Sequence, residues 1–348
     1  MTIDDKTTEI GSEFWDIPVS AVSNNLFPPL IQWYLSGRTA LQAIIEEVNH
    51  VKTVAIPSWC CHTIIKPFID VGIKVFFYPV YFDKTLIQKL RFDCDALLLM
   101  DYFGYSHHEI ANLSQYQGVI IRDITHSIFS KSYSDADYYF GSLRKWCGFW
   151  TGGYAWMKDG YKLASSKYGN DEYIKNRKKA MELKNCYVNK VPDAEEHYVK
   201  DKHYLKLFKQ AESFLDNNNK EIISASMRDI QLAHKLDIKS ITDKRRANAK
   251  ILMDAFPACL MFNELESNDV LLFVPILVPQ GKREQLRQYL IQHEIYCPVH
   301  WPISEYHKLD KQTEFIYKNE LSLICDQRYT EDDMKRIVKT INDFMKVA

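Results

Sequence analysis

The stretch from Gly118 to Lys158 constrains the fold of this 348-residue chain more than any other part. Val119 to Ile121 is a short β-branched run that follows a glycine, a pattern typical of a strand buried on both faces. A second strand-like segment covers Tyr154 to Met157 and follows a glycine pair. Further apolar runs alternate with helical patterns and cover residues 53–56, 74–80 and 96–100. This alternation predicts an α/β fold with a doubly wound, mostly parallel sheet that is flanked by helices.

The rest of the chain predicts amphipathic helices and a second, smaller unit. Apolar residues recur at helical spacing after residue 36 and again over residues 64–71, 170–184, 198–215 and 282–293. Met227 to Leu236 is expected to begin a long helix, and Leu271 to Pro279 is expected to form a strand. Thr330 and Asp333 make a capping box for a final helix. We expect a large α/β domain over residues 1–230 and a smaller α+β C-terminal domain over residues 231–348.

Three polar side chains of the central stretch point to one kind of chemistry. Asp123 follows the buried strand at once, and His126 and Lys145 come later, the lysine among bulky apolar neighbours. Ligands of parallel sheets bind beyond the carboxyl ends of the strands, where Asp123 is expected to lie. A desolvated lysine is a good nucleophile toward the aldehyde of pyridoxal phosphate, and an acid can pair with the ring nitrogen. Singly, such residues more often cap turns or snorkel at the surface, but the ordered set is more specific.

The same stretch holds, in order, an acid, a histidine, a serine, a lysine and a glycine pair. These residues are Asp123, His126, Ser142, Lys145, Gly152 and Gly153. Their order resembles the DegT/DnrJ/EryC1/StrS family of sugar aminotransferases, which depend on pyridoxal phosphate. The resemblance extends from about Gly11 to the C-terminus. It implies the fold-type I architecture of such transferases, and a homodimer in which the partner chain completes each active site.

A helix start near residue 37 is a candidate phosphate site. Ser36 and Gly37 precede an apolar helical pattern, and a helix N-terminus presents backbone N–H groups and the positive end of a dipole. An ordinary capped helix would leave the same pattern. In the family this segment holds the cofactor phosphate, so the resemblance assigns Gly37, Arg38 and Thr39 to that role. It assigns a further phosphate contact to Ser142.

An aromatic ring stacks on the pyridine face of the cofactor in the family, and the sequence leaves open which ring does so here. Cys61 occupies the family's position, and Trp59 lies two residues earlier. Trp59 can turn toward the cofactor, Cys61 can pack weakly on it, or Trp150 or His126 can cover it. Core packing accounts for Trp59 equally well. Trp59 and Cys61 are therefore both candidate cofactor-binding residues.

Three further residues are candidates for substrate binding. His300 and Trp301 lie in the segment C-P-V-H-W-P, which resembles a proline-flanked segment that lies near the active site in the family. A rigid loop with a packed histidine would show the same pattern. Arg144 stands beside Lys145 and can contact the cofactor phosphate or a phosphate of the substrate.

The resemblance implies a transamination in which an amino acid, typically L-glutamate, donates nitrogen to a keto sugar that is usually nucleotide-linked. Such reactions serve surface-polysaccharide or deoxyamino-sugar biosynthesis. Lys145 would act as general base and acid, Asp123 would keep the ring nitrogen protonated, and His126 would pack on or hydrogen-bond to the ring. Two alternatives stay open: a small phosphorylated ketone as acceptor, or a homologue that binds pyridoxal phosphate without turnover.

The composition argues against several other classes. A formal net charge of −1 gives no basic footprint, so nucleic acid is not an expected partner. The eight cysteines form no C-x-x-C pair and indicate reduced thiols of a cytoplasmic protein. The N-terminus has no signal-peptide pattern, and no run approaches the ~18 apolar residues of a membrane span. Adjacent His107 and His108 cannot both face one ion from a helix, so no metal site is expected.

Overall fold

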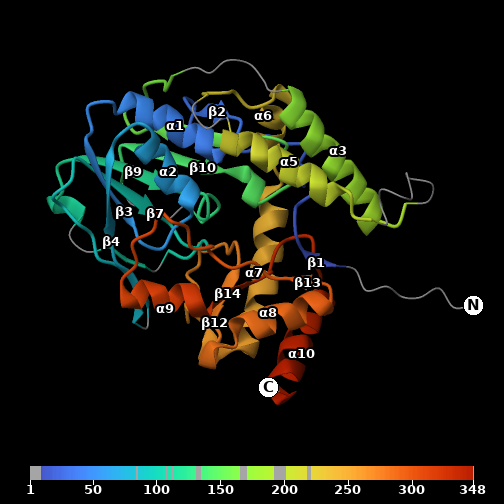
Figure 1. The fold of residues 1–348 in the computed structure, drawn as a ribbon. Helices are drawn as coiled ribbons and strands as arrows, with labels where there is room; N and C mark the ends of the chain where they lie inside the picture. The colour runs from blue at the N-terminus through green and yellow to red at the C-terminus, as the bar shows by residue number, and fades with distance from the viewer. Residues whose placement is uncertain are drawn as a thin grey trace, which may run out of the picture.

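The computed structural model describes residues 9–83, 85–106, 108–110, 113–130, 135–164, 171–191, 201–217 and 221–347. A sheet with its helices forms one part of the molecule, and the C-terminal elements, orange and red in Figure 1, gather beside it. No helix in these described ranges combines the length and the apolar character needed to cross a membrane.

A seven-stranded sheet forms the centre of the fold. Neighbouring strands follow the order β2 (Gln32–Tyr34), β11 (Gly153–Met157), β10 (Tyr138–Ser142), β9 (Val119–Asp123), β7 (Ala96–Met100), β3 (Thr53–Pro57) and β4 (Lys74–Tyr78). From β10 to β4 every neighbouring pair is parallel, whereas β11 is antiparallel to both β10 and β2. The prediction of a mostly parallel sheet is therefore confirmed.

The apolar runs form strands because both faces of the sheet are covered. All five residues of β7 are buried, as are four of the five residues of β3. A strand with apolar residues on both faces is stable only where both faces are covered, so such runs lie in the middle of a parallel sheet. Since β9, β7 and β3 are parallel, the segments that follow Asp123, Met100 and Pro57 meet at one edge of the sheet.

Helices α1 (Gly37–Glu47) and α2 (His62–Asp70) pack on this sheet. Two further helices are α3 (Asp171–Val188) and α5 (Tyr204–Asn217). Helix α1 packs on β10 and β11 and also contacts α2, while α3 and α5 pack along each other (Figure 1). The seven buried residues of α1 include the run from Ala40 to Ile45, because this helix is enclosed between the sheet and α2.

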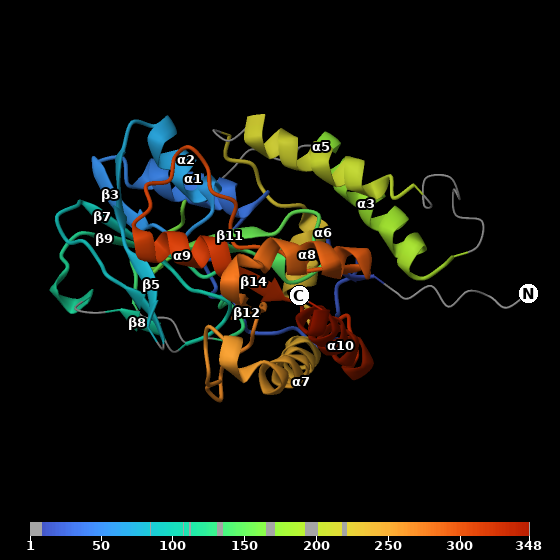
Figure 2. The same cartoon turned by 60° about the horizontal axis from the view of Figure 1, so that its bottom comes forward.

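The C-terminal part is built around a two-stranded antiparallel sheet of β12 (Val274–Leu277) and β14 (Glu320–Leu323). Its helices are α7 (Ile238–Ala255), α8 (Arg283–Gln292), α9 (Lys311–Asn319) and α10 (Glu331–Val347). Helices α7 and α10 lie side by side below β12 and β14 in Figure 2. Thr330 and Asp333 exchange hydrogen bonds at the start of α10, so the predicted capping box is confirmed.

Smaller elements complete the fold. A three-stranded sheet contains β5 (Val80–Asp83), β6 (Thr85–Gln88) and β8 (His108–Ile110). Four single turns of 3-10 helix are η1 (Leu113–Gln115), η2 (Leu143–Lys145), η3 (Pro257–Cys259) and η4 (Pro279–Gly281). The turn η2 matters most, because it carries Lys145 away from the end of β10.

The expectation of one long helix from Met227 is wrong. Helix α6 (Met227–Ala233) ends after seven residues, and α7 begins separately at Ile238. The Asp237 carboxylate accepts a hydrogen bond from the backbone N–H of Ser240 and so starts the second helix. An aspartate that caps a helix from outside is favoured over one inside it, which explains the break.

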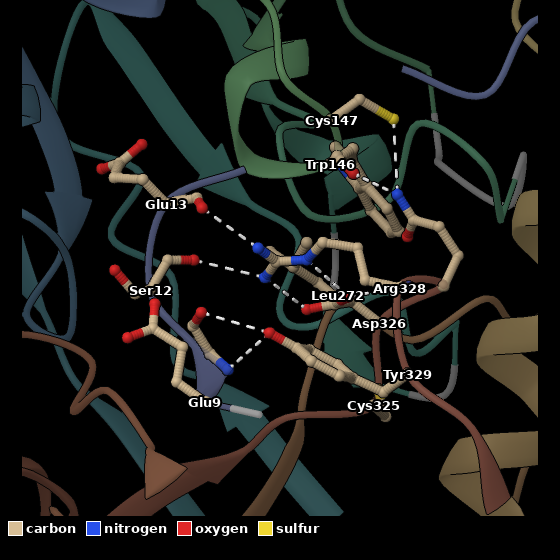
Figure 3. A network of polar contacts seen from close by, with 12 residues as sticks. Glu9, Ser12, Glu13, Trp146, Cys147, Leu272, Cys325, Asp326, Arg328 and Tyr329 are labelled. Atoms are coloured by element: carbon tan, nitrogen blue, oxygen red, sulfur yellow. Dashed lines mark hydrogen bonds and ion pairs between the residues drawn. The ribbon is translucent and has the colours of Figure 1, made fainter. Parts of the chain in front are cut away.

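The N-terminal segment is fastened to the C-terminal part of the chain. Strand β1 (Ile10–Gly11) pairs in parallel with β13 (Ile295–Tyr296). The Arg328 guanidinium donates to the backbone oxygens of Ser12 and Glu13 at 3.2 and 3.0 Å and lies 2.8 Å from Asp326 Oδ2, as Figure 3 shows. The network therefore ties residues 10–13 to the loop before α10.

We expect Arg328→Met to lower the free energy of unfolding by about 3–5 kcal/mol, because it leaves the buried Asp326 carboxylate without its partner. The measurement is the midpoint of unfolding in urea. Lys335→Met, which breaks the exposed pair with Glu331, is the control and should change the free energy by less than about 1 kcal/mol. Equal effects of the two variants would contradict the proposed importance of this buried pair.

Candidate active site

A cavity of about 190 Å³ lies at the carboxyl edge of the central sheet. Most of the predicted site residues line it. These residues are Gly37, Arg38, Cys61, Asp123, His126, Ser142, Arg144, Lys145 and Trp301. The structure thus brings together side chains from α1, from the loops after β3 and β9, from η2 and from the segment after β13.

Asp123 is the last residue of β9, and only 7% of its surface is exposed. Its Oδ1 accepts a hydrogen bond of 2.8 Å from the backbone N–H of Thr125. Burial raises the pKa of the carboxyl to about 6, although the Thr125 hydrogen bonds and the charge of Lys145 act in the opposite direction. A cation placed against this carboxylate would offset the cost of its burial.

Lys145 ends η2 and is exposed, although its sequence neighbours suggested a desolvated amine. The apolar neighbour Trp146 is buried on the other side, where its Nε1 donates to the backbone oxygen of Thr125 at 2.6 Å. The Lys145 side chain lines the cavity with Asp123, and its charge acts on the Asp123 carboxyl. The amine and the acid therefore face one space.

His126 is a buried ring in the wall of the cavity and is held in its neutral form. Its Nδ1 accepts a hydrogen bond of 3.2 Å from the backbone N–H of Phe103, which leaves the proton on Nε2. Burial lowers the pKa of His126 well below its usual range, and the charges of His300 and Lys145 act in the same direction. The Trp301 ring stacks on His126 with the centroids 5.8 Å apart.

The start of α1 lies very close to the neighbouring strands at two glycines. A Cβ on Gly153 would lie 2.0 Å from the backbone oxygen of Ser36, so the strand can meet the helix only with glycine there. Gly152 has a φ of +120°, which also favours glycine. A Cβ on Gly37 would lie 3.3 Å from Cβ of Ser142. The first amides of α1 and the Ser142 hydroxyl therefore flank one small space that suits an anion.

Arg38 and Thr39 are occupied within the protein. Arg38 is paired with Glu212 and Asp216 of α5, although it lines the cavity. The backbone N–H of Thr39 donates to Ser36 Oγ at 3.2 Å, and the two hydroxyls are also hydrogen-bonded, so Thr39 stabilises the helix start. The side chain of Thr39 is not part of the cavity lining found among the described residues.

Glu212 of α5 collects three guanidinium groups at the rim of the cavity. It pairs with Arg38, Arg144 and Arg177. Burial acts to raise the pKa of Glu212, but the three arginines outweigh it and lower the pKa to about 2. The Arg144 side chain, a candidate for substrate binding, is thereby held by a carboxylate. Glu212 itself was not predicted, because no local motif marks a residue of one amphipathic helix for such a role.

Among the candidate rings, Trp59 and Trp150 lie away from the cavity. Trp59 is completely buried, stacks on Tyr102 with the centroids 4.8 Å apart, and donates through Nε1 to the backbone oxygen of His300. Trp150 packs beneath the guanidinium of Arg228, which lies 4.0 Å from the ring centroid. Of the four candidates, only Cys61 and His126 line the space beside Lys145.

His300 supports the site from behind Trp301. The backbone N–H of His300 donates to Glu320 Oε2 at 2.7 Å, and its Nδ1 lies 2.8 Å from Ser322 Oγ. Burial lowers the pKa of His300 to about 3 and raises that of Glu320 to about 7. Trp301 lines the cavity, while the described lining does not include His300. The sequence analysis also considered His107 and His108 and expected no metal site there. His107 lies outside the described residues, and nothing is described of the His108 side chain.

Cys61 is the N-cap residue of α2 and faces the cavity. The Thr63 hydroxyl donates to its Sγ at 3.1 Å. Burial acts to raise the pKa of this thiol, but hydrogen bonds from His62 and Thr63 and the charge of Lys145 lower it to about 7. The neighbouring Cys60 is fully buried, and burial raises the pKa of its thiol well above the usual value.

Comparisons with known proteins show that solved structures share this fold. No protein-family model and no curated protein sequence matches the chain. Among solved structures, it is similar to the aminotransferase TlmJ from Streptoalloteichus hindustanus, with a TM-score of 0.61 and 14% identity over 91% of this chain and 86% of that one. A DegT DnrJ EryC1 StrS aminotransferase from Brucella abortus gives a TM-score of 0.57 and 14% identity over 90% and 85% of the two chains.

The sugar aminotransferase CalS13 from Micromonospora echinospora is similar as well, with a TM-score of 0.56 and 12% identity over 90% of this chain and 87% of that one. At such low identity these similarities establish the fold. The chain therefore has the fold of the fold-type I transferases that depend on pyridoxal phosphate, as predicted. The resemblance to the DegT/DnrJ/EryC1/StrS family is confirmed at this level.

We expect Asp123→Asn to stabilise the cofactor-free protein above pH 6. An acid with a raised pKa in the folded state contributes stability below its unfolded pKa of 3.8 and loses it as the pH rises through about 6. At pH 8 the variant should be more stable by up to about 3 kcal/mol, and the gain should vanish near pH 4. Urea unfolding at several pH values measures this difference.

Asp95→Asn is the control of opposite sign, because the Lys52 and Thr53 amides lower the pKa of Asp95. This variant should lose stability relative to the wild type as the pH rises. A stability difference for Asp123→Asn that is the same at pH 4 and pH 8 would contradict the raised pKa of the buried carboxyl.

Cys61 should be alkylated by iodoacetamide near neutral pH, with a rate that rises through about pH 7, because the thiolate is the reactive form. Mass spectrometry of the peptide that holds both cysteines measures the reaction. Cys60 is the internal control and should stay unmodified in the folded protein. Alkylation of Cys61 only above pH 9 would show that its thiol has no lowered pKa.

Proposed function

We propose that this chain is a pyridoxal-phosphate-dependent aminotransferase that moves an amino group from an amino acid to a keto sugar. One observation carries the proposal: Lys145, Asp123 and the N-terminus of α1 line a single cavity. An amine, a buried acid and an anion cradle are the groups that hold this cofactor. The solved structures that share the fold include sugar aminotransferases, which supports the choice of a sugar as acceptor.

The residues present fit the cofactor. The start of α1 has no acidic residue in its first turn, and Gly37 leaves room beside Ser142, so amides and a hydroxyl would hold the phosphate. Asp123 would pair with the ring nitrogen, and the positive charge would lower the pKa of the carboxyl again. His126 and Cys61 would border the ring. Arg38 would act indirectly, since Glu212 and Asp216 hold its guanidinium.

The chain's own groups would then perform the proton transfers. Pyridoxal phosphate, when bound, supplies an electron sink. The Lys145 Nζ would take the proton from the donor carbon that bears the nitrogen and would return it to the cofactor carbon on the other side of that nitrogen. Asp123 would hold the ring nitrogen in its protonated form. The neutral His126, with its proton on Nε2, would offer a hydrogen-bond donor without adding a second positive charge.

The finer parts of the proposal concern substrates and setting. L-glutamate is the proposed donor, and a nucleotide-linked keto sugar is the proposed acceptor, in surface-polysaccharide or deoxyamino-sugar biosynthesis. We further propose a homodimer that shares its active sites, and a division into a large domain up to residue 230 and a smaller one after it. The eight cysteines are all unpaired, which supports a reducing, cytoplasmic setting.

The test is an absorbance spectrum of the purified protein after addition of pyridoxal phosphate. We expect the visible band of a lysine-bound cofactor, and we expect L-glutamate to bleach it. Lys145→Ala should lose the band, whereas Lys158→Ala, which removes an exposed lysine paired with Asp135, should keep it. A colourless wild type would refute the proposal, and a band that no amino donor bleaches would favour a homologue without turnover.

A further inference from the structure

Strand β14 buries a glutamate and a serine on one of its faces. Its four residues read E-L-S-L, and all four are buried. Because side chains alternate along a strand, Glu320 and Ser322 face one side while the two leucines face the other. A buried carboxylate is costly unless its oxygens are hydrogen-bonded, so the partners of Glu320 indicate what this face of the strand holds in place.

Both carboxylate oxygens of Glu320 hold His300, one directly and one through Ser322. Oε2 accepts a hydrogen bond of 2.7 Å from the backbone N–H of His300. Oε1 accepts a hydrogen bond from the Ser322 hydroxyl, whose oxygen lies 2.8 Å from His300 Nδ1. Trp59 Nε1 donates to the backbone oxygen of the same histidine. His300 is therefore fixed at its backbone N–H, at its carbonyl group and at its ring.

The His300 ring lies between residues of two cavities. A second cavity, of about 380 Å³, adjoins the first at Lys145. The His300 ring packs on Phe273, which lines the second cavity, with the centroids 5.0 Å apart. It also packs on His126 and Trp301, which line the first, at 5.7 and 5.1 Å. Because Trp301 follows directly in the chain, the hold on the His300 backbone also sets the place of the Trp301 ring in the wall.

The hydrogen bonds determine which nitrogen of His300 carries the proton. The Glu320 carboxyl is ionised above about pH 7, and an ionised carboxylate can only accept, so the single proton of the Ser322 hydroxyl is committed to it. The hydroxyl oxygen then accepts from His300, which places the proton of this neutral ring on Nδ1. His126 has the opposite tautomer, because its Nδ1 accepts from the backbone N–H of Phe103.

The two histidines thus present opposite groups at Nε2, a proton on His126 and a lone pair on His300, and add no charge to the wall. We propose that Glu320 is a positioning residue of this site. It holds the His300 backbone, and with it Trp301, in the cavity wall. Through Ser322 it also keeps the His300 proton on Nδ1. That the cavity is an active site rests on the proposed function, whereas the position of the proton rests on the hydrogen bonds alone.

An isosteric substitution, Glu320→Gln, should move the His300 proton to Nε2. The backbone N–H of His300 needs an acceptor, so the carboxamide oxygen takes the place of Oε2 and the NH2 group faces Ser322. The Ser322 hydroxyl then accepts from the amide and donates its own proton to His300 Nδ1. The His300 backbone stays held, so this variant moves the proton without releasing the segment.

The test is nitrogen-15 NMR of the cofactor-free, histidine-labelled protein at pH 9. We expect His300 of the wild type to be protonated at Nδ1 and that of Glu320→Gln to be protonated at Nε2. Loss of the signals in His300→Gln identifies them; without that variant, the count of rings protonated at Nδ1 should fall by one in Glu320→Gln. Glu314→Gln removes an exposed partner of Lys318 in α9 and should leave the histidine signals unchanged.

The wild type supplies a second measurement, because protonation of Glu320 should act as the amide does. The groups that act with Glu320 are Arg283 of α8, which favours its ionised form, the neutral His300 ring, and Cys297, whose pKa is raised to about 12. Burial raises the pKa of Glu320 to about 7, so it gains a proton below that pH. This proton belongs on Oε1, since Oε2 accepts from a backbone N–H. The His300 proton should therefore move to Nε2 between pH 9 and pH 5.5.

A wild-type His300 that is protonated at Nε2 at pH 9, or the same tautomer in the wild type and Glu320→Gln, would overturn the inference. An equal change in Glu314→Gln would do so as well. If Glu320→Gln does not fold, the pH series decides, because an unchanged tautomer between pH 9 and pH 5.5 overturns the inference too. Bleaching by L-glutamate is measured on separate samples loaded with pyridoxal phosphate. The tautomer change without bleaching would refute the aminotransferase but keep the role of Glu320, and the reverse result would refute only that role.

Discussion

The close approach between the start of α1 and strand β11 is the contact on which the site depends. The backbone of Ser36 lies where a side chain at position 153 would be, so glycine alone permits helix and strand to meet. The approach sets the first amides of α1 beside Ser142 at the end of β10, and β10 in turn lies next to β9, which ends in Asp123. The positions of the proposed phosphate site, of Lys145 and of Asp123 therefore depend on contacts between neighbouring backbone segments.

The cations around the cavity differ in whether they have an ion-pair partner. Glu212 pairs with three guanidinium groups at once and holds the side chains of Arg38 and Arg144 beside α5. Lys145 has no such partner among the salt bridges of the described residues, and its side chain stays exposed to both cavities. Glu212 thus holds the two arginines at the rim, while Lys145 stays exposed, as its proposed role as a proton carrier requires.

Much of the fold and part of the site were predictable from local patterns. Short apolar runs located β3, β7 and β9, because a strand covered on both faces has few polar residues. Asp123 and Lys145 were predicted to lie together because their order along the chain is specific, and the structure places both at one cavity. The pairing of Arg38 with α5 was not predictable, because it depends on contacts between residues 174 or more positions apart, which no local pattern records. For Trp59 the sequence left core packing and cofactor contact open, and the structure shows core packing. Asp237 was a missed cap that a search for helix starts could have found.

The pairing of β1 with β13 affects the order in which parts of the protein can fold during synthesis. Ile10 is opposite Ile295, so β1 is synthesised long before its neighbour and cannot pair until β13 has been made. Until then the segment that follows β1 has no sheet to join, and the central strands must assemble without it. Completion of the wall of the proposed active site is therefore expected to come late, after the sheet that carries Asp123 has formed.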